Sequence, residues 1–81
     1  MATTMERLCS VILKFKKDKI SAAALKPEAL FQENLGFDSL DFSELLVLVE
    51  DEFGLELELD GLRQYTTIEA MVKYLDSRLA G

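Results

Sequence analysis

Ser39 is the residue whose type and position best suit chemistry in this sequence. It follows Gly36, Phe37 and Asp38 in a predicted turn and opens a predicted helix over Ser39–Phe53. Free backbone N–H groups and the positive end of the helix dipole converge at such a position, which favours a phosphate. An exposed hydroxyl there is accessible to another enzyme and suited to carry a phosphodiester, although serine is also common at helix starts for capping alone.

The amino-acid composition excludes several other kinds of site. The chain has no histidine and one cysteine, Cys9, which rules out an intrachain disulfide and a zinc site built from Cys and His. Serine and cysteine nucleophiles activated by histidine are excluded for the same reason. Cys9 lies near the apolar face of the first predicted helix, and we interpret it as a packing residue. We therefore predict no metal site and no catalytic residue.

Charge is divided unevenly along the sequence. Residues 1–26 hold six Lys or Arg against two acids, whereas residues 27–62 hold eleven Asp or Glu and no basic residue. The net charge of the whole chain is −6. Such a surface repels nucleic acid and anionic membranes and attracts proteins with basic patches, although it is also compatible with solubility alone.

The length and composition fit one small domain over residues 1–81. The chain has 81 residues, of which 49% are hydrophobic and 30% are charged, a composition typical of a globular protein. No apolar run approaches the roughly 18 residues needed to cross a bilayer. The N-terminal residues lack the basic and apolar stretches of a signal peptide, so we expect a cytoplasmic protein without membrane insertion.

Two capping boxes and two apolar faces predict the first and last helices. Thr3 and Glu6 have capping-box spacing at the first helix, and Thr66 and Glu69 have it at the last. The first helix repeats apolar residues on one face: Met5, Leu8, Val11, Ile12 and Phe15. The predicted buried face of the last helix consists of Ile68, Val72, Leu75 and Leu79.

The second helix carries the strongest local signals. Asp38 is a good N-cap, and Asp41 has the place of the acidic partner in a capping box. Phe37 and Phe42 match a hydrophobic staple, and Gly54 can take the left-handed conformation that ends a helix. The predicted core stripe consists of Phe42, Leu45, Leu46, Val49 and Phe53.

The connections are expected to be a short helical turn over residues 59–65 and a long loop over residues 18–38. A loop of this length is unusual in so small a domain unless side chains anchor it. Its apolar residues are spaced to pin it onto the helices: Ile20, Leu25, Leu30, Phe31 and Leu35.

The sequence around Ser39 continues into an acidic helix. The string Leu35-Gly36-Phe37-Asp38-Ser39-Leu40-Asp41 is followed by Glu44-Leu45 and by Glu50-Asp51-Glu52-Phe53. This pattern resembles the acyl carrier protein family, whose attachment site reads Leu-Gly-x-Asp-Ser-Leu-Asp at the start of an acidic second helix. With Phe31 upstream and Thr66-Thr67-Ile68 opening the last helix, the resemblance spans essentially the whole chain.

The resemblance implies an all-α fold, a small four-helix bundle with three main helices, a short third helix and a long first loop. It implies that Ser39 carries 4′-phosphopantetheine, transferred from coenzyme A by a phosphopantetheinyl transferase with magnesium. Asp38 would support that transfer. The terminal thiol of the arm would then hold acyl groups as thioesters, and the protein itself would catalyse nothing.

The resemblance also implies a partner-binding face on the second helix. By position this face consists of Leu40, Asp41, Glu44, Val47, Glu50 and Asp51. The implied partners are the transferase and acyl-transferring or acyl-processing enzymes with basic patches, and we expect a monomer. Three acids at residues 50–52 crowd the negative end of the helix dipole, where each is unfavourable by about 0.3–1 kcal/mol. Local rules broken in this way tend to mark functional positions.

Some residues depart from the family's usual pattern. Ser43 stands where the family commonly has an apolar residue, Asn34 where it has an acid, and Phe37 where it has a small residue. The pathway therefore stays open between general fatty-acid synthesis and a polyketide, lipid A-type, aminoacyl or other specialised acyl chain. The alternative function from another class is an unmodified acidic helical adaptor that binds a basic partner protein.

Overall fold

The computed structural model describes residues 3–16 and 19–80. Within these residues it contains four α-helices and one short 3-10 helix: α1 (Thr4–Phe15), η1 (Ala22–Ala24), α2 (Ser39–Phe53), α3 (Leu59–Arg63) and α4 (Ile68–Ala80). The predicted all-α fold, with three main helices, a short third helix and a long first connection, is confirmed. None of the helices in the described residues is long and apolar enough to cross a membrane.

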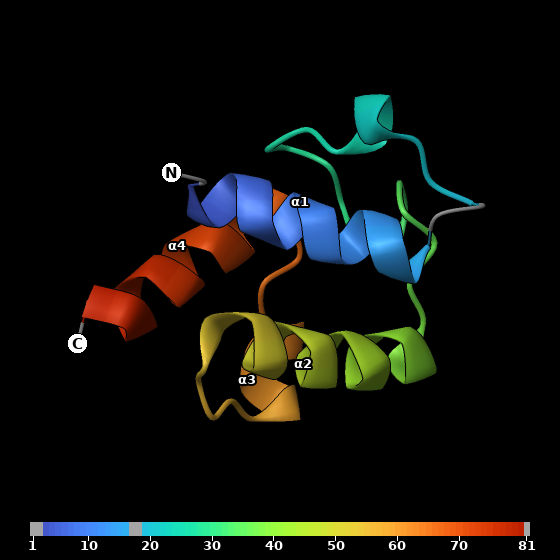
Figure 1. Cartoon of the computed structure of the whole chain (residues 1–81). Coiled ribbons are helices and arrows are strands. Elements are labelled where there is room, and N and C mark those ends of the chain that lie inside the picture. Colours follow the sequence, from blue (N-terminus) through green and yellow to red (C-terminus); the bar gives the residue numbers. More distant parts are fainter. Residues whose placement is uncertain (1–2, 17–18, 81) are drawn as a thin grey trace.

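The helices pack around one apolar core. α1 contacts both α2 and α4, and α3 contacts α2. Figure 1 shows α1 and α2 side by side and running in opposite directions, which brings the end of α1 close to the start of α2. The predicted faces of α1 and α2 supply much of the core: Leu8, Val11, Ile12, Phe42, Leu45, Val49 and Phe53.

Both predicted ends of α2 are confirmed, as is the cap of α1. The Thr3 hydroxyl accepts the Glu6 N–H and the Glu6 carboxylate accepts the Thr3 N–H, both at 3.1 Å. Asp38 is the N-cap of α2, and Gly54 ends the helix with φ +65°, a conformation that glycine adopts without strain.

The cap of α4 differs from the prediction. The Thr67 hydroxyl, not that of Thr66, accepts the Ala70 N–H at 3.1 Å. The Thr66–Glu69 capping box is therefore wrong by one residue. Thr66 is instead tied to the long loop, because its carbonyl accepts the N–H of Phe31 at 2.9 Å.

The buried face of α4 also differs in part. Ile68, Met71 and Leu75 are fully buried, whereas Val72 is only half-buried. Leu79 is 42% exposed, so its predicted place in the core is wrong. Leu75 is the last buried residue of α4, and Leu79 lies one turn beyond it, past the end of the core.

The long loop is anchored both by side chains and by its backbone. Of the predicted anchors, Ile20, Phe31 and Leu35 are buried, and Leu25 and Leu30 are half-buried. Three backbone hydrogen bonds of 2.9–3.1 Å join the loop to the start of α4: Phe31 N–H to Thr66 O, Ile68 N–H to Ala29 O, and Glu69 N–H to Pro27 O. The loop thus supplies acceptors for helix N–H groups that have no partner within α4.

Candidate functional site

Ser39 is exposed and is the first residue of α2. The two residues that flank its turn hold each other: the Asp38 carboxylate accepts the Asp41 N–H at 2.9 Å, and the Asp41 carboxylate accepts the Asp38 N–H at 3.1 Å. This capping box needs no contribution from the Ser39 side chain. The Ser39 hydroxyl is therefore not needed to cap α2.

The turn before Ser39 is fixed by a glycine and a buried phenylalanine. Gly36 has φ +70°, a region that residues with a Cβ rarely adopt. The next residue, Phe37, turns its side chain into the core, and its N–H donates to the Phe31 carbonyl at 2.9 Å. The backbone that leads to Ser39 is thus fixed by the buried Phe37 ring and by the hydrogen bond of the Phe37 N–H.

An aromatic cluster lies under this turn. The Phe37 ring contacts those of Phe15, Phe31 and Phe42, with centroid separations of 5.9, 5.3 and 5.6 Å. The rings meet edge-to-face or tilted, the arrangements that aromatic quadrupoles favour. The contact between Phe37 and Phe42 confirms the predicted hydrophobic staple.

Lys16, at the end of α1, reaches the start of α2. Its ammonium lies 2.9 Å from the Asp41 carboxylate and 5.3 and 5.4 Å from the ring centroids of Phe15 and Phe37. The side chains of Lys16 and Asp41 are only 13% and 18% exposed. Partial burial opposes ionisation of Asp41, but hydrogen bonds from Lys16 and the Asp38 N–H, with the lysine charge, outweigh it and hold the Asp41 pKa below its ordinary value.

Acid is expected to remove the contribution of this ion pair to stability. Because the folded-state pKa of Asp41 is depressed, its contribution is present above the ordinary pKa of 3.8 and is lost as the pH falls through the folded-state value. Asp41→Asn should lower the free energy of unfolding by about 1 kcal/mol at neutral pH. Urea denaturation at a series of pH values should show this difference shrinking in acid.

Asp51→Asn is the matched control, since it also removes one acid from α2 but one that is exposed. A destabilisation by Asp41→Asn that stays constant from neutral pH into acid would assign the effect to packing and not to charge.

The charges around Ser39 are compatible with a phosphate. Two carboxylates, Asp38 and Asp41, flank the serine and would by themselves repel an anion. Lys16 neutralises one of them. The N–H groups of Ser39 and Leu40 belong to the first turn, where helix geometry leaves such groups without an intrahelical acceptor. A phosphate on Ser39 would therefore meet backbone donors and the positive end of the α2 dipole.

The predicted partner-face residues divide into two groups. Leu40 and Val47 are 73% and 56% exposed, and Glu44 and Asp51 are also exposed. These four side chains are available to another molecule. Asp41 is the fifth, and its carboxylate is engaged in the capping box and with Lys16.

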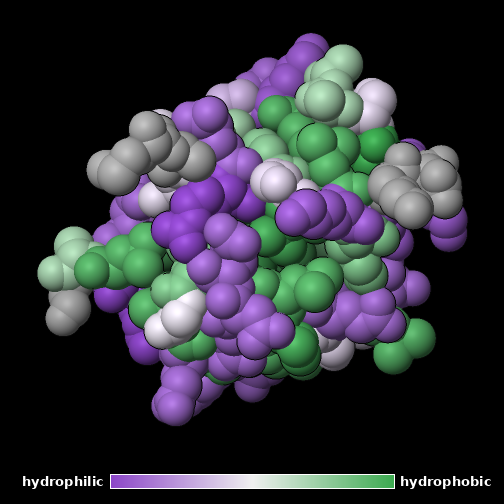
Figure 2. All heavy atoms as spheres, viewed as in Figure 1, coloured by the Kyte–Doolittle hydropathy of each residue, from purple (hydrophilic) through white to green (hydrophobic). Residues whose placement is uncertain are grey.

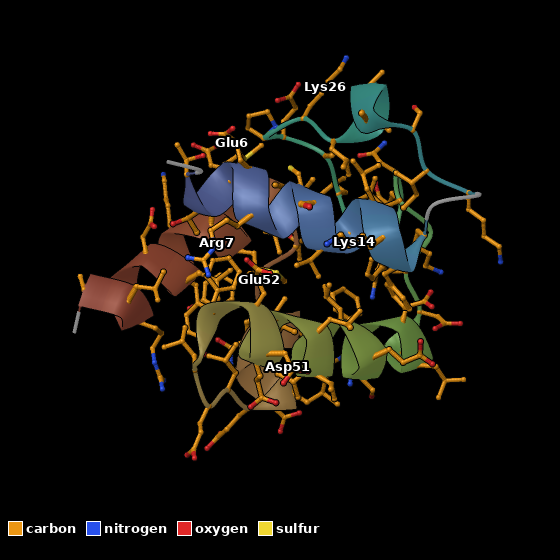
Figure 3. All side chains as sticks on the ribbon, viewed as in Figure 1. Glu6, Arg7, Lys14, Lys26, Asp51 and Glu52 are labelled. Atoms are coloured by element: carbon orange, nitrogen blue, oxygen red, sulfur yellow. The ribbon has the colours of Figure 1, made fainter. Side chains whose placement is uncertain are left out.

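Glu50, the sixth, is held by its own chain. Its carboxylate accepts the Leu57 N–H at 2.8 Å, which ties the end of α2 to the connection before α3. Glu52 pairs with Arg7 at 3.0 Å, and the two side chains point toward each other between α1 and α2 in Figure 3. Two of the three acids that crowd the end of α2, Glu50 and Glu52, thus have structural partners, and the third, Asp51, is exposed.

Two residues that depart from the family pattern have local roles. The Asn34 side-chain oxygen accepts the Leu30 N–H at 2.8 Å. The Ser43 hydroxyl donates to the Ser39 carbonyl at 3.2 Å, one turn along α2.

Within residues 3–16 and 19–80, no three His, Cys, Asp or Glu side chains come together as a metal site.

Lys16 is not recognisable from the sequence as part of this site. The ion pair joins residues of two helices separated by the long loop, and no local spacing rule relates them. The available signal was the antiparallel arrangement of neighbouring helices, which places a base at the end of α1 near an acid at the start of α2.

The chain is similar in sequence to a known family of phosphopantetheine attachment sites and to acyl carrier proteins. The family model described as the phosphopantetheine attachment site matches residues 7–75. The acyl carrier protein of Nitratidesulfovibrio vulgaris strain Miyazaki F is 39% identical over 59 residues, which cover 73% of this chain and 78% of that protein. The acyl carrier protein of the Hildenborough strain matches with the same identity and coverage.

Proposed function

The chain belongs to the acyl carrier protein family, and we propose that Ser39 is the residue to which its phosphopantetheine arm is attached. The protein is a carrier and not an enzyme, and its cofactor is 4′-phosphopantetheine from coenzyme A. When attached, this group supplies a thiol that holds an acyl chain as a thioester. The observation that carries the assignment is the exposed Ser39 hydroxyl at the first position of α2, flanked by Asp38 and Asp41 in the family's attachment string.

The residues around Ser39 have distinct roles in this proposal. Asp38 orients the start of α2 through its cap and lies beside the hydroxyl that is modified. Lys16 lowers the negative charge that the incoming phosphate meets, because it pairs with Asp41. Leu40, next to Ser39 and 73% exposed, offers an apolar contact to the modifying enzyme.

The wider proposal concerns the setting of the carrier. Members of this family interact with a phosphopantetheinyl transferase and with acyl-processing enzymes, and we propose that those enzymes meet the acidic face of α2 through basic patches. Residues 1–81 would act as a single carrier domain, as a monomer in the cytoplasm. The acyl chain would belong to fatty-acid, polyketide or another specialised acyl biosynthesis.

The test is the mass of the purified protein after incubation with a phosphopantetheinyl transferase, coenzyme A and magnesium. We expect a single addition of phosphopantetheine, and peptide mapping should place it on Ser39. An addition on another serine would overturn the assignment of Ser39. A protein that is folded yet never modified would favour the unmodified acidic adaptor.

Charge reversal on α2 is expected to slow encounter with the transferase. Exposed charges steer association more than they hold a complex, so Glu44→Lys with Asp51→Lys should reduce the association rate roughly tenfold at low salt and flatten its salt dependence. Glu50 is left unchanged because its carboxylate holds the Leu57 N–H. Stopped-flow association across a salt series measures the effect.

The matched control is Glu28→Lys with Glu56→Lys, which makes the same change in net charge at two exposed acids outside α2. Equal slowing by both double variants would mean that net charge, and not the face of α2, steers the encounter. Circular dichroism should show that each variant is folded.

A further inference from the structure

A groove of about 840 Å³ lies between α1 and α2, on the face that Figures 2 and 3 show. Figure 2 shows apolar side chains gathered in the middle of this face, with hydrophilic side chains around them. The apolar lining comes from both helices: Val11 and Phe15 of α1, and Val47 and Leu48 of α2. The groove begins at Ser43 and Glu44, one helical turn beyond Ser39.

The sequence of α2 explains why this apolar surface stays open. Residues 45–49 are five consecutive Leu or Val, and successive residues of a helix point about 100° apart. Their side chains therefore surround the helix, and no orientation of α2 can bury all of them. Leu45 and Val49 are fully buried in the core, whereas Val47 and Leu48 are 56% and 37% exposed. This exposed apolar surface is rimmed by polar residues, an arrangement that interaction sites share.

The edges of the groove carry opposite charges. On the α2 side, Glu44 and Asp51 are exposed, whereas Glu52 is occupied by Arg7. On the α1 side the charged residue is Lys14, which is exposed and lies on this same face in Figure 3. An anionic membrane or a nucleic acid would face two acids at the α2 edge and is disfavoured.

The spacing along α2 defines what would fit. Glu44 and Asp51 are two helical turns apart, about 10 Å along the axis, and Val47 and Leu48 lie between them. A second helix laid along α2 presents side chains with the same period. It would therefore match this edge with two basic residues about two turns apart and with apolar residues between them.

We propose that the groove between α1 and α2 binds an amphipathic helix of a partner protein. The apolar residues of that helix lie between Val11 and Phe15 on one side and Val47 and Leu48 on the other. Its Lys or Arg residues face Glu44 and Asp51, and an acid on its opposite flank faces Lys14. This inference rests on the proposed carrier function, and it goes beyond the α2 face because α1 forms half of the site.

The experiment uses the phosphopantetheine-bearing protein and a synthetic helical peptide. In the peptide, two neighbouring leucines lie between lysines two turns apart, and one glutamate lies on the other flank. Titration into isotopically labelled protein should shift the amide resonances of Val11, Lys14, Phe15, Val47 and Leu48. Val47→Ser with Leu48→Ser should weaken binding roughly tenfold, which corresponds to about 1.4 kcal/mol. Leu79→Ser, at an apolar residue of α4 that is 42% exposed, is the matched control and should leave the affinity unchanged.

Lys14→Glu tests the contribution of α1 separately. It places an acid opposite the peptide's glutamate and should weaken binding severalfold, whereas a peptide with lysine in place of that glutamate should regain affinity for this variant. Binding that ignores Lys14→Glu, or resonance shifts confined to α3 and α4, would overturn the proposal. An acyl chain on the arm that shifts the same residues and displaces the peptide would also overturn it, because the carrier's own cargo would then be the occupant.

Failure of this inference can be told from failure of the proposed function. Intact mass on the same sample reports whether Ser39 is modified. A modified protein whose groove does not bind the peptide refutes the docking proposal alone, whereas a chain that cannot be modified refutes the carrier assignment of Ser39 whatever the peptide does.

Discussion

Ser39→Ala is expected to abolish attachment of phosphopantetheine while the protein stays folded. The hydroxyl oxygen forms the bond to the phosphate, so no residual modification can remain at this position. The helix start does not depend on it, because the cap is formed by Asp38 and Asp41. Alanine is well tolerated at the first helical position, and we expect a change in the free energy of unfolding of less than about 0.5 kcal/mol. Intact mass after incubation with the transferase, together with circular dichroism, measures both outcomes.

Ser43→Ala is the control for this experiment. Ser43 lies one turn along α2 from Ser39, and its hydroxyl donates to the Ser39 carbonyl. It is the other serine of this helix and therefore the nearest alternative site for attachment of phosphopantetheine. We expect this variant to be modified in full. Modification of Ser39→Ala, or loss of modification in Ser43→Ala while Ser39 remains, would refute the assignment.

Phe31→Ala is expected to have the largest effect on stability, about 3–5 kcal/mol. Phe31 is fully buried, and its ring lies 5.3 and 5.7 Å from the ring centroids of Phe37 and Phe42. The truncation would leave a cavity under the turn that leads to Ser39. Since small domains are stable by only about 5–15 kcal/mol, the urea midpoint should fall sharply.

Leu25→Ala provides the comparison within the same loop, because Leu25 is only half-buried against the core. It should cost about 1 kcal/mol. A loss below about 1 kcal/mol for Phe31→Ala would mean that the aromatic cluster can collapse and refill the cavity. The role given to Phe31 in holding the turn would then be wrong.

The sequence predicts α2 well because its signals are local. Asp38 and Asp41 are three residues apart, and both halves of their capping box form within one turn. Gly54 ends the helix through its own backbone conformation, with φ +65°. Neither device needs any other part of the chain, so spacing in the sequence is sufficient to predict them.

The start of α4 could not be predicted in the same way. The acceptors for the N–H groups of Ile68 and Glu69 are carbonyls of the long loop, some forty residues earlier in the chain. Local spacing favours Thr66 as the cap, because an acid, Glu69, lies three residues after it, whereas Thr67 has Ala70 at that position. Tertiary contact decides between them, because the Thr66 carbonyl is taken by Phe31 and the Thr67 hydroxyl is left to cap Ala70.

The same distinction applies to the site. Ser39 and Asp38 are recognisable from a short string, whereas the partners of Asp41 and Glu50 depend on how other segments pack. Lys16 comes from another helix, and Leu57 from the connection after α2. Residues placed on a partner face by their position along α2 can therefore be occupied within the chain. The residues of α1 that line the groove cannot be predicted from the sequence of α2 alone.

The backbone anchoring of the long loop has a consequence for how this protein can change over evolution. The bonds that tie it to α4 run between main-chain atoms, so any residue except proline can donate at positions 31, 68 and 69, and any residue at all can accept at 27, 29 and 66. Side chains around the 3-10 helix, such as those of Ala22, Ala23 and Lys26, are exposed and carry no part of that attachment. Mutations can accumulate there without displacing the turn that bears Ser39. This stretch is where descendants of the chain can acquire new surface chemistry while the modified serine stays in register.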